Sequence, residues 1–319
     1  MGMDRVKRCR GVIVPMITPF TEEGKIDLDA AGRVAEYLVE GGTKVFLLGT
    51  TGESASIPDS EKIPLVKAVL DKVGDRSPVY AGISGNCFAT SVDLANRYFD
   101  MGIEAVVAHL PHYYPLTPEH MLRYYEALAD AISGPLILYN IPSTTHISIP
   151  LEVIEKLSYH PKIIGLKDSE GDVARLERSL EMWRDREDFS HLVGSSPLSF
   201  RGLSLGSSGI VPSGGNVVPH MYSRLYQAAV SGDLRRAESL QRETDEITGI
   251  YARGRGLTQS LAALKVMMSE LGLCKPWVLP PILPLSGKER EKIREEMIRF
   301  GLIKFPSYYI ERGIIGDSR

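Results

Sequence analysis

The chain has 319 residues, of which 43% are hydrophobic and 24% are charged, and its formal net charge is −3 at pH 7. This balance is typical of a globular protein with a large core, and it excludes the strongly basic surface of a protein that binds nucleic acid or anionic membranes. The three cysteines, Cys9, Cys87 and Cys274, are widely spaced, so we expect a reducing cytoplasmic location rather than a disulfide framework or a zinc site. The longest apolar runs fall short of the roughly 18 residues of a membrane-spanning helix, so small-molecule chemistry is the expected function.

Short apolar runs alternate with amphipathic segments along the first two thirds of the chain. The runs predict strands at 11–18, 44–48, 79–83, 105–108, 136–138, 163–166, 191–193 and 209–211. The intervening segments predict helices at 28–39, 58–73, 89–101, 118–131, 151–157, 172–183 and 198–203. Repeated strand–helix units imply parallel strands with right-handed crossovers, so we predict a (β/α)8 TIM barrel over residues 1–217. A doubly wound open sheet is the alternative, but no GxGxxG motif follows the first strand.

Helical periodicity continues after the last predicted strand. It covers 221–230, 234–248, 258–271 and 286–300, and the proline-rich segment 275–284 precedes the last of these. We expect residues 218–319 to form a C-terminal helical region that packs on the barrel or builds an oligomer contact. Residues 305–319 have no clear periodicity, and the sequence alone does not place them.

Lys167 stands where the sixth apolar run ends and the chain becomes polar. An amine with apolar neighbours is disfavoured in its charged form, and the neutral amine can attack a carbonyl carbon. A lysine that extends its head group into water at the end of a strand is the ordinary alternative for this segment taken alone. The residues at the other strand ends decide between the two interpretations.

Hydroxyl-bearing side chains follow most of the predicted strands. In TIM barrels the chemistry lies on the loops that leave the carboxyl ends of the strands. The polar residues at those ends are Thr50, Thr51, Ser84, Tyr113, Tyr114, Tyr139, Asn140, Ser169, Ser195, Ser196 and Ser213. The sequence contains neither a P-loop nor a nucleophile elbow. Hydroxyls around one lysine instead suit Schiff-base chemistry, which needs a neutral amine and weakly acidic proton shuttles.

Two other classes of function are weighed against a Schiff-base enzyme. His109, His112 and His120 would suggest a metal-dependent class II aldolase, but no carboxylate stands at ligand spacing beside them. We therefore expect no metal and no cofactor. A binding protein without catalysis is the other alternative, and the joint presence of a strand-end lysine with nearby hydroxyls disfavours it.

Four motifs at strand ends resemble the dihydrodipicolinate synthase/N-acetylneuraminate lyase family. They are Gly49-Thr50-Thr51-Gly52-Glu53, Tyr113-Tyr114-Pro115, Tyr139-Asn140-Ile141-Pro142 and Gly165-Leu166-Lys167-Asp168-Ser169, and the resemblance runs from about Gly11 to Gly301. It implies a class I lyase or aldolase that acts on pyruvate and an aldehyde. It also implies that pyruvate is held as an imine on Lys167, and that the chain forms a homo-oligomer, either a dimer or a tetramer.

The resemblance implies a role for several residues. Lys167 would form the imine, Tyr139 would move protons beside it and position the substrate carboxylate, and Thr50 and Tyr114 would complete the proton relay. Thr51 and the backbone N–H groups of the turn through Gly52 would hold the pyruvate carboxylate, since oriented amides favour an anion. The carbonyl group of Val211 would face the bound pyruvate.

The second substrate is where the sequence departs from the family pattern. Thr144 stands where dihydrodipicolinate synthases have an arginine for the semialdehyde carboxylate, and a hydroxyl cannot make that bidentate charged contact. Arg253 or Arg255 could supply a substitute cation. Ser169 and Ser213 are similar to hydroxyl positions of sialic acid lyases, but Ser196 and Pro197 replace their acidic pair.

The departures favour retro-aldol cleavage of a small 2-oxo acid to pyruvate and an aldehyde. A 2-oxo-3-deoxy sugar acid or 4-hydroxy-2-oxoglutarate would suit a site lined by hydroxyls, at Thr144, Ser169 and Ser213. Dihydrodipicolinate synthase remains the alternative function, and N-acetylneuraminate lyase is a weaker one.

Overall fold

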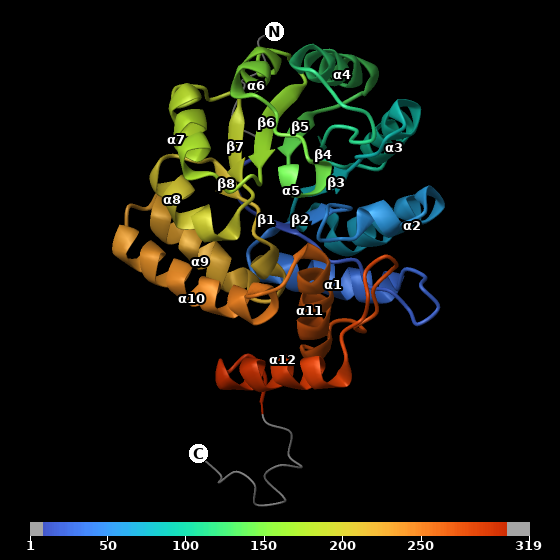
Figure 1. The fold of residues 1–319 in the computed structure, drawn as a ribbon, viewed down its shortest axis with the longest axis vertical. Coiled ribbons are helices and arrows are strands. Elements are labelled where there is room, and N and C mark those ends of the chain that lie inside the picture. The colour runs from blue at the N-terminus through green and yellow to red at the C-terminus, as the bar shows by residue number, and fades with distance from the viewer. Residues whose placement is uncertain (1–8, 305–319) are drawn as a thin grey trace, which may run out of the picture.

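In the computed structural model, which describes residues 9–304, eight parallel strands form a closed barrel (Figure 1). The strands are β1 (Gly11–Pro15), β2 (Lys44–Leu47), β3 (Val79–Gly82), β4 (Ala105–Ala108), β5 (Leu136–Asn140), β6 (Ile163–Asp168), β7 (Ser190–Val193) and β8 (Gly209–Ile210). Each strand pairs with the next in the chain, and β8 pairs with β1. The predicted TIM barrel is confirmed, and the segment 305–319 that the sequence did not place lies outside the described residues.

Helices surround the barrel in the order that the periodicity predicts (Figure 1). They are α1 (Leu28–Glu40), α2 (Asp59–Val73), α3 (Phe88–Asp100), α4 (Pro118–Ala131), α6 (Leu151–Leu157), α7 (Val173–Met182), α8 (Ser199–Ser204) and α9 (Pro219–Val230). Asp27 begins α1 by accepting a hydrogen bond from the Ala30 N–H, and Thr117 caps α4 in the same way. Short helical turns that the sequence did not predict are α5 (Pro142–Thr145), η1 (Ser54–Ser56), η2 (Gly74–Arg76), η3 (Ser196–Leu198) and η4 (Ser213–Asn216).

Three further helices form the C-terminal part of the described chain. They are α10 (Leu234–Ala252), α11 (Leu257–Glu270) and α12 (Gly287–Arg299). In Figure 1 α11 lies between the barrel and α12, and the residues Leu261 to Met268 of α11 are all buried. A helix that is buried on every side has protein around it rather than water. None of the helices in residues 9–304 is long and apolar enough to cross a membrane.

Alternate residues of the strands fill the inside of the barrel. This inner cluster consists of Cys9, Ile13, Phe46, Tyr80, Ala105, Val107, Ile137, Tyr139, Ile141, Leu192 and Val211. Glycines let neighbouring strands approach closely: a Cβ atom at Gly82 would lie 2.1 Å from the Leu48 carbonyl oxygen. The inner cluster is a packed apolar floor beneath the carboxyl ends of the strands.

Candidate active site

Lys167 lies inside the mouth of the barrel, and 4% of its surface is exposed. Its Nζ lies 3.8 Å from the centre of the Tyr139 ring and 4.8 Å from the centre of the Phe46 ring. The other side chains that line this space are apolar, such as Val107 and Leu192, except for the phenol of Tyr80. The head group therefore does not extend into water, and the ring faces lie where they would stabilise a positive charge on this nitrogen.

Tyr139 is held beside Lys167 by the sheet itself. The two residues are direct partners in the register of β5 and β6, so their side chains leave the barrel wall at the same height. The Tyr139 hydroxyl lies 3.4 Å from Oγ1 of Thr50, which follows β2. Hydrogen bonds between catalytic groups are often long in the free enzyme and tighten when substrate binds, so these two hydroxyls could pass a proton between them.

The turn that follows β2 contains the residues that were expected to bind a carboxylate. The Gly49 carbonyl oxygen accepts hydrogen bonds from the N–H groups of Gly52 and Ser54, at 3.1 and 3.4 Å. The N–H group of Thr51 has no hydrogen-bond partner within residues 9–304. A Cβ atom at Gly52 would lie 3.0 Å from the Met16 carbonyl oxygen, so the turn packs tightly on the segment that follows β1. The Thr51 N–H group is therefore open for an anion, whereas that of Gly52 is not.

Glu53 joins the end of this turn to the C-terminal part of the described chain. The residue adopts a left-handed conformation with φ 56°, and its Oε1 lies 2.8 Å from Nζ of Lys265 in α11. Its other carboxylate oxygen accepts a hydrogen bond of 2.9 Å from the Leu279 N–H. Burial lowers the pKa of Lys265, and Glu53 opposes that shift. The C-terminal helices are thus linked to the turn that holds Thr50 and Thr51.

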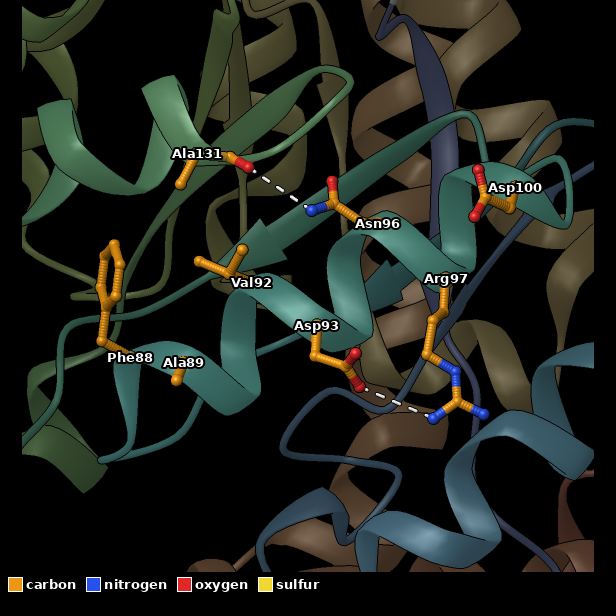
Figure 2. Close-up of a pocket in the computed structure, with 8 residues that line it drawn as sticks. All are labelled: Phe88, Ala89, Val92, Asp93, Asn96, Arg97, Asp100 and Ala131. Atoms are coloured by element: carbon orange, nitrogen blue, oxygen red, sulfur yellow. Dashed lines mark hydrogen bonds and ion pairs between the residues drawn. The ribbon is translucent and has the colours of Figure 1, made fainter.

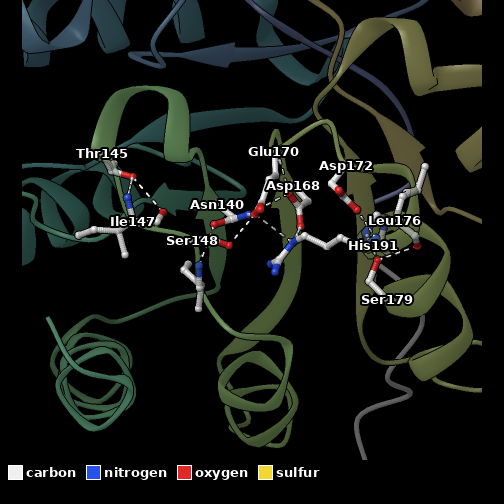
Figure 3. Close-up of polar contacts among 12 residues, drawn as sticks. Asn140, Thr145, Ile147, Ser148, Asp168, Glu170, Asp172, Leu176, Ser179 and His191 are labelled. Atoms are coloured by element: carbon white, nitrogen blue, oxygen red, sulfur yellow. Dashed lines mark hydrogen bonds and ion pairs between the residues drawn. The ribbon is translucent and has the colours of Figure 1, made fainter.

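A second polar network supports the end of β6 (Figure 3). Asp168, next to Lys167, accepts hydrogen bonds from Nδ2 of Asn140 at 3.0 Å and from Nε of Arg175 at 2.7 Å. Asn140 also donates to Glu170 at 2.8 Å, and Ser148 donates to the same carboxylate oxygen at 2.6 Å. Sequence reasoning missed this network because its members are spread over β5, β6 and α7. It holds the backbone on which Lys167 sits.

Three of the predicted substrate-binding residues follow β6 and β8. Ser169 faces Gly194, where a Cβ atom would lie 2.0 Å from the serine oxygen, so only glycine leaves room for this hydroxyl. Val211 is buried in the wall around Lys167. Ser213 shares a hydrogen bond of 2.7 Å with the hydroxyl of Tyr251 in α10. The structure gathers these three residues at the carboxyl ends of the strands.

Thr144 lies in α5, on the loop after β5, where its hydroxyl donates a hydrogen bond of 3.3 Å to the Ile141 carbonyl oxygen. The two arginines that could replace a missing cation have other partners. Arg253 forms an ion pair of 3.3 Å with Glu246, and Arg255 donates a hydrogen bond of 2.8 Å to the Ile250 carbonyl oxygen. Neither guanidinium is held toward Thr144 by these contacts.

Tyr114 does not join Thr50 and Tyr139 within a single copy of the described chain. It is 72% exposed, and its ring packs edge-on against the 75% exposed ring of Tyr113, with 5.0 Å between the ring centres. A relay role for Tyr114 would need a rearrangement of its loop or a second chain.

His109 is a further polar residue at the mouth of the barrel, and sequence reasoning considered it only as a metal ligand. Its ring centre lies 6.2 Å from that of Tyr139 and 5.9 Å from that of His112. Burial lowers its pKa, the hydrogen bond to the Leu110 carbonyl oxygen opposes the shift, and His112 and Lys167 add to it when they are charged. No group of three or more His, Cys, Asp or Glu side chains in residues 9–304 is placed to hold a metal ion. The signal that would have found it is alternation, since Ala105 and Val107 point inward and His109 is the next residue in that series.

A surface groove between α3 and α4 is separate from this site (Figure 2). Its polar groups already bind one another: Arg97 pairs with Asp93 at 3.6 Å, and Asn96 donates a hydrogen bond of 3.4 Å to the Ala131 carbonyl oxygen. The groove contributes no side chain to the surroundings of Lys167.

Comparison with known proteins finds relatives of one kind, and they align with nearly the whole chain. The sequence matches the dihydrodipicolinate synthetase family over residues 8–299. It is 33% identical over 297 residues to 4-hydroxy-tetrahydrodipicolinate synthase 2 of Streptomyces coelicolor, which covers 91% of this chain and 95% of that protein. Dihydrodipicolinate synthase of Bacteroides thetaiotaomicron superposes with a TM-score of 0.87 at 31% identity, covering 94% of this chain and 100% of that one. YagE, a prophage protein of Escherichia coli solved in complex with pyruvate, superposes with a TM-score of 0.87 at 25% identity, covering 93% and 100%.

Proposed function

The chain belongs to the dihydrodipicolinate synthetase family of lyases, as its motifs predicted, and on that premise we propose that it holds pyruvate as an imine on Lys167. The pyruvate complex of YagE supports the proposal, because that protein shares the fold over nearly all of this chain. The imine carries a positive charge when protonated, and the ring faces of Tyr139 and Phe46 lie beside the nitrogen that would bear it. Thr51 would bind the pyruvate carboxylate through its N–H group and hydroxyl.

Tyr139 serves as the proton shuttle in this proposal. Formation of the imine removes water from the amine and the carbonyl group, so protons must move to and from the oxygen that leaves. The phenol lies over Lys167 and contacts Thr50 at 3.4 Å. Tyr114 belongs to the same relay only if a second copy or a moved loop brings it inward, since it is 72% exposed in one chain.

The finer function that we propose is retro-aldol cleavage of a small hydroxylated 2-oxo acid, such as a 2-oxo-3-deoxy sugar acid or 4-hydroxy-2-oxoglutarate. The observation that carries it is Thr144, whose hydroxyl stands where a synthase is expected to have its arginine. Arg253 and Arg255 make other contacts. Hydroxyls at Thr144, Ser169 and Ser213 would bind the hydroxyl groups of such an acid, and a threonine lacks the bidentate contact that an arginine would make with the carboxylate of aspartate semialdehyde.

Dihydrodipicolinate synthase activity is the second candidate. The curated relatives in Streptomyces coelicolor and Acidothermus cellulolyticus, at 33% and 32% identity, carry the name 4-hydroxy-tetrahydrodipicolinate synthase. That reaction uses the same pyruvate imine with a different aldehyde. The two candidate functions therefore make different demands only on the residues that would bind the aldehyde.

Two further properties belong to the same proposal. We expect a cytoplasmic protein, which the free thiols of Cys87 and Cys274 support. We also expect a homo-oligomer. The exposed rings of Tyr113 and Tyr114 support it, because a second copy could cover them.

The direct test is to treat the protein with pyruvate and borohydride and to map the modified peptide by mass spectrometry. A reduced pyruvyl adduct is expected on Lys167 and is expected to be absent in Lys167→Ala. A chelator should leave activity unchanged. An adduct on another residue, or none, would contradict the imine, and loss of activity that zinc restores would favour a class II aldolase.

A further inference from the structure

His109 lies in the same layer of the barrel as the two residues at the centre of the site. In the register of β4 and β5, Val107 pairs with Ile137 and Ala108 pairs with Leu138. The next step along both strands brings His109 alongside Tyr139, and Tyr139 in turn pairs with Lys167. Because inward residues alternate, the histidine continues the series of Ala105 and Val107, which belong to the inner cluster. Three neighbouring strands therefore present an imidazole, a phenol and an amine at one height.

The backbone fixes the position and the tautomer of this imidazole. The N–H group of His109 donates a hydrogen bond of 2.9 Å to Oγ of Ser84, which follows β3. Nδ1 of the ring lies 2.8 Å from the Leu110 carbonyl oxygen. A carbonyl oxygen only accepts, so Nδ1 carries the proton, and in the neutral ring Nε2 has a free lone pair. Nε2 has no hydrogen-bond partner in residues 9–304.

Burial favours the neutral form of the ring. It lowers the pKa of His109, the hydrogen bond to the Leu110 carbonyl oxygen opposes the shift, and His112 and Lys167 add to it when they are charged. A neutral imidazole with an open lone pair is a good acceptor for a hydroxyl group. This is the reverse of what an arginine offers, and it agrees with the hydroxyl of Thr144 on the loop after β5.

We propose that His109 is a catalytic residue whose Nε2 accepts a hydrogen bond from the C4 hydroxyl of the 2-oxo acid and removes its proton during cleavage. The inference rests on the proposed imine at Lys167. It adds the group that takes the proton from the hydroxyl on the carbon that becomes the aldehyde.

The cleavage needs no oxidant or reductant, and its protons are supplied by groups of the site and one water molecule. The hydroxyl proton passes to Nε2, and the bonding pair that it leaves becomes the second bond of the aldehyde carbonyl group. The bond between C3 and C4 breaks, and its pair forms a double bond between C2 and C3 while the iminium nitrogen becomes neutral. The imidazolium then gives its proton to C3 of this enamine. Water hydrolyses the resulting imine, which releases pyruvate and the free amine of Lys167.

Two variants and a matched control test the assignment. His109→Phe keeps a ring of similar shape without nitrogen, and His109→Gln keeps a hydrogen-bonding group that cannot take the proton. His220→Phe is the control, because this exposed histidine lies in α9, on the outside of the barrel. Each protein is assayed by borohydride trapping of pyruvate, and by cleavage of 4-hydroxy-2-oxoglutarate and 2-oxo-3-deoxygluconate.

Trapping of pyruvate should stay within about threefold of the unmodified protein in all three variants, because pyruvate has no C4 hydroxyl. Cleavage should fall roughly 10²- to 10⁴-fold in both His109 variants, the usual contribution of a positioned base. KM should rise roughly tenfold in His109→Phe and stay nearly constant in His109→Gln, since only the glutamine keeps a hydrogen bond. His220→Phe should cleave at the normal rate.

The contrary outcomes separate this inference from the proposed function. If the unmodified protein does not trap pyruvate, the imine on Lys167 is wrong. If trapping occurs but His109→Phe cleaves at the normal rate, the role of His109 is wrong. It is also wrong if the unmodified protein traps pyruvate yet cleaves neither acid, because both carry the C4 hydroxyl, or if both His109 variants lose trapping to the same extent as cleavage.

Discussion

Glu53 and Lys265 form a buried ion pair of 2.8 Å in which both side chains are 1% exposed. One residue ends the turn that carries Thr50 and Thr51, and the other lies in the middle of α11. Two charges taken out of water are stable only as a pair, because the desolvation of either one alone is costly. The arrangement of the candidate carboxylate site therefore depends on a residue near the other end of the chain.

We expect Lys265→Met to lower the free energy of unfolding by roughly 3–5 kcal/mol, because it leaves the Glu53 carboxylate buried and unpaired. Denaturant unfolding measures the loss. The control is Lys67→Met, which breaks an exposed pair with Asp71 whose side chains are 68% and 65% accessible, and it should change the value by less than about 1 kcal/mol. The double variant Glu53→Gln/Lys265→Met should recover part of the loss. Equal stability of Lys265→Met and Lys67→Met would show that the ion pair is dispensable.

Tyr139→Phe should slow turnover by roughly 10²- to 10⁴-fold, because the variant keeps the ring over Lys167 and loses the hydroxyl that moves protons. Steady-state kinetics with the best 2-oxo acid measures the change. Tyr37→Phe is the matched control, since its hydroxyl donates a hydrogen bond of 2.6 Å to the Val217 carbonyl oxygen away from the site. A Tyr139→Phe enzyme as fast as the control would remove Tyr139 from the mechanism.

Thr144→Arg should raise the condensation of pyruvate with aspartate semialdehyde and lower the cleavage of the hydroxylated acids. A bidentate contact between arginine and a carboxylate contributes on the order of 1.5–3 kcal/mol, which is roughly one to two decades of kcat/KM. Thr144→Lys is a useful comparison, because lysine adds the positive charge without the planar guanidinium that makes two parallel hydrogen bonds. Semialdehyde condensation in the unmodified protein as fast as its best aldol reaction would instead favour the synthase function.

His191 makes stability depend on pH. Burial lowers its pKa to about 4 in the folded protein, below the ordinary value of roughly 6.5 in an unfolded chain. Between those values the unfolded chain binds a proton that the folded protein does not, so stability is complete above about pH 6.5 and falls as the pH drops towards 4.

We expect the loss from His191 to be roughly 1.4 kcal/mol for each pH unit in that window. The measurement is denaturant unfolding at pH 7 and pH 5 for the unmodified protein and for His191→Gln. The variant should be less stable at pH 7, because it disturbs a contact of 3.0 Å with Ser179, but it should lose less stability on acidification. An unchanged pH dependence would mean that His191 is not the responsible group. The exposed His112→Gln serves as the control.

The barrel could be predicted from the sequence because its signal is local. Apolar runs such as 105–108 and 163–166 each indicate a strand by themselves, and their regular alternation with helices leaves few topologies. The expectation that the chemistry of a TIM barrel lies at the carboxyl ends of its strands also selected Lys167 and Tyr139. The structure places Nζ of Lys167 3.8 Å from the centre of the Tyr139 ring. Residues that continue an inward series could have been found in the same way, and His109 is one of them.

The contacts that support the site could not be predicted, because they join residues with no shared local pattern. In the sequence, Arg175 is one of several charged residues on the amphipathic helix α7. Only the folded chain brings its Nε within 2.7 Å of Oδ2 of Asp168. Lys265 lies in a helix whose other residues are mostly apolar, and nothing near it in the sequence indicates Glu53. Pairs of this kind depend on where whole elements meet in space.

The pairing of β1 with β8 has a consequence for how the protein is made. Gly11 in β1 pairs with Gly209, so the first strand emerges from the ribosome long before its partner exists. At roughly 5–20 residues per second, synthesis leaves one edge of β1 unsatisfied for about 10–40 s. An open apolar edge of this kind can pair with another chain. We therefore expect the nascent chain to need protection by chaperones during this interval, a need that ends when β8 closes the ring.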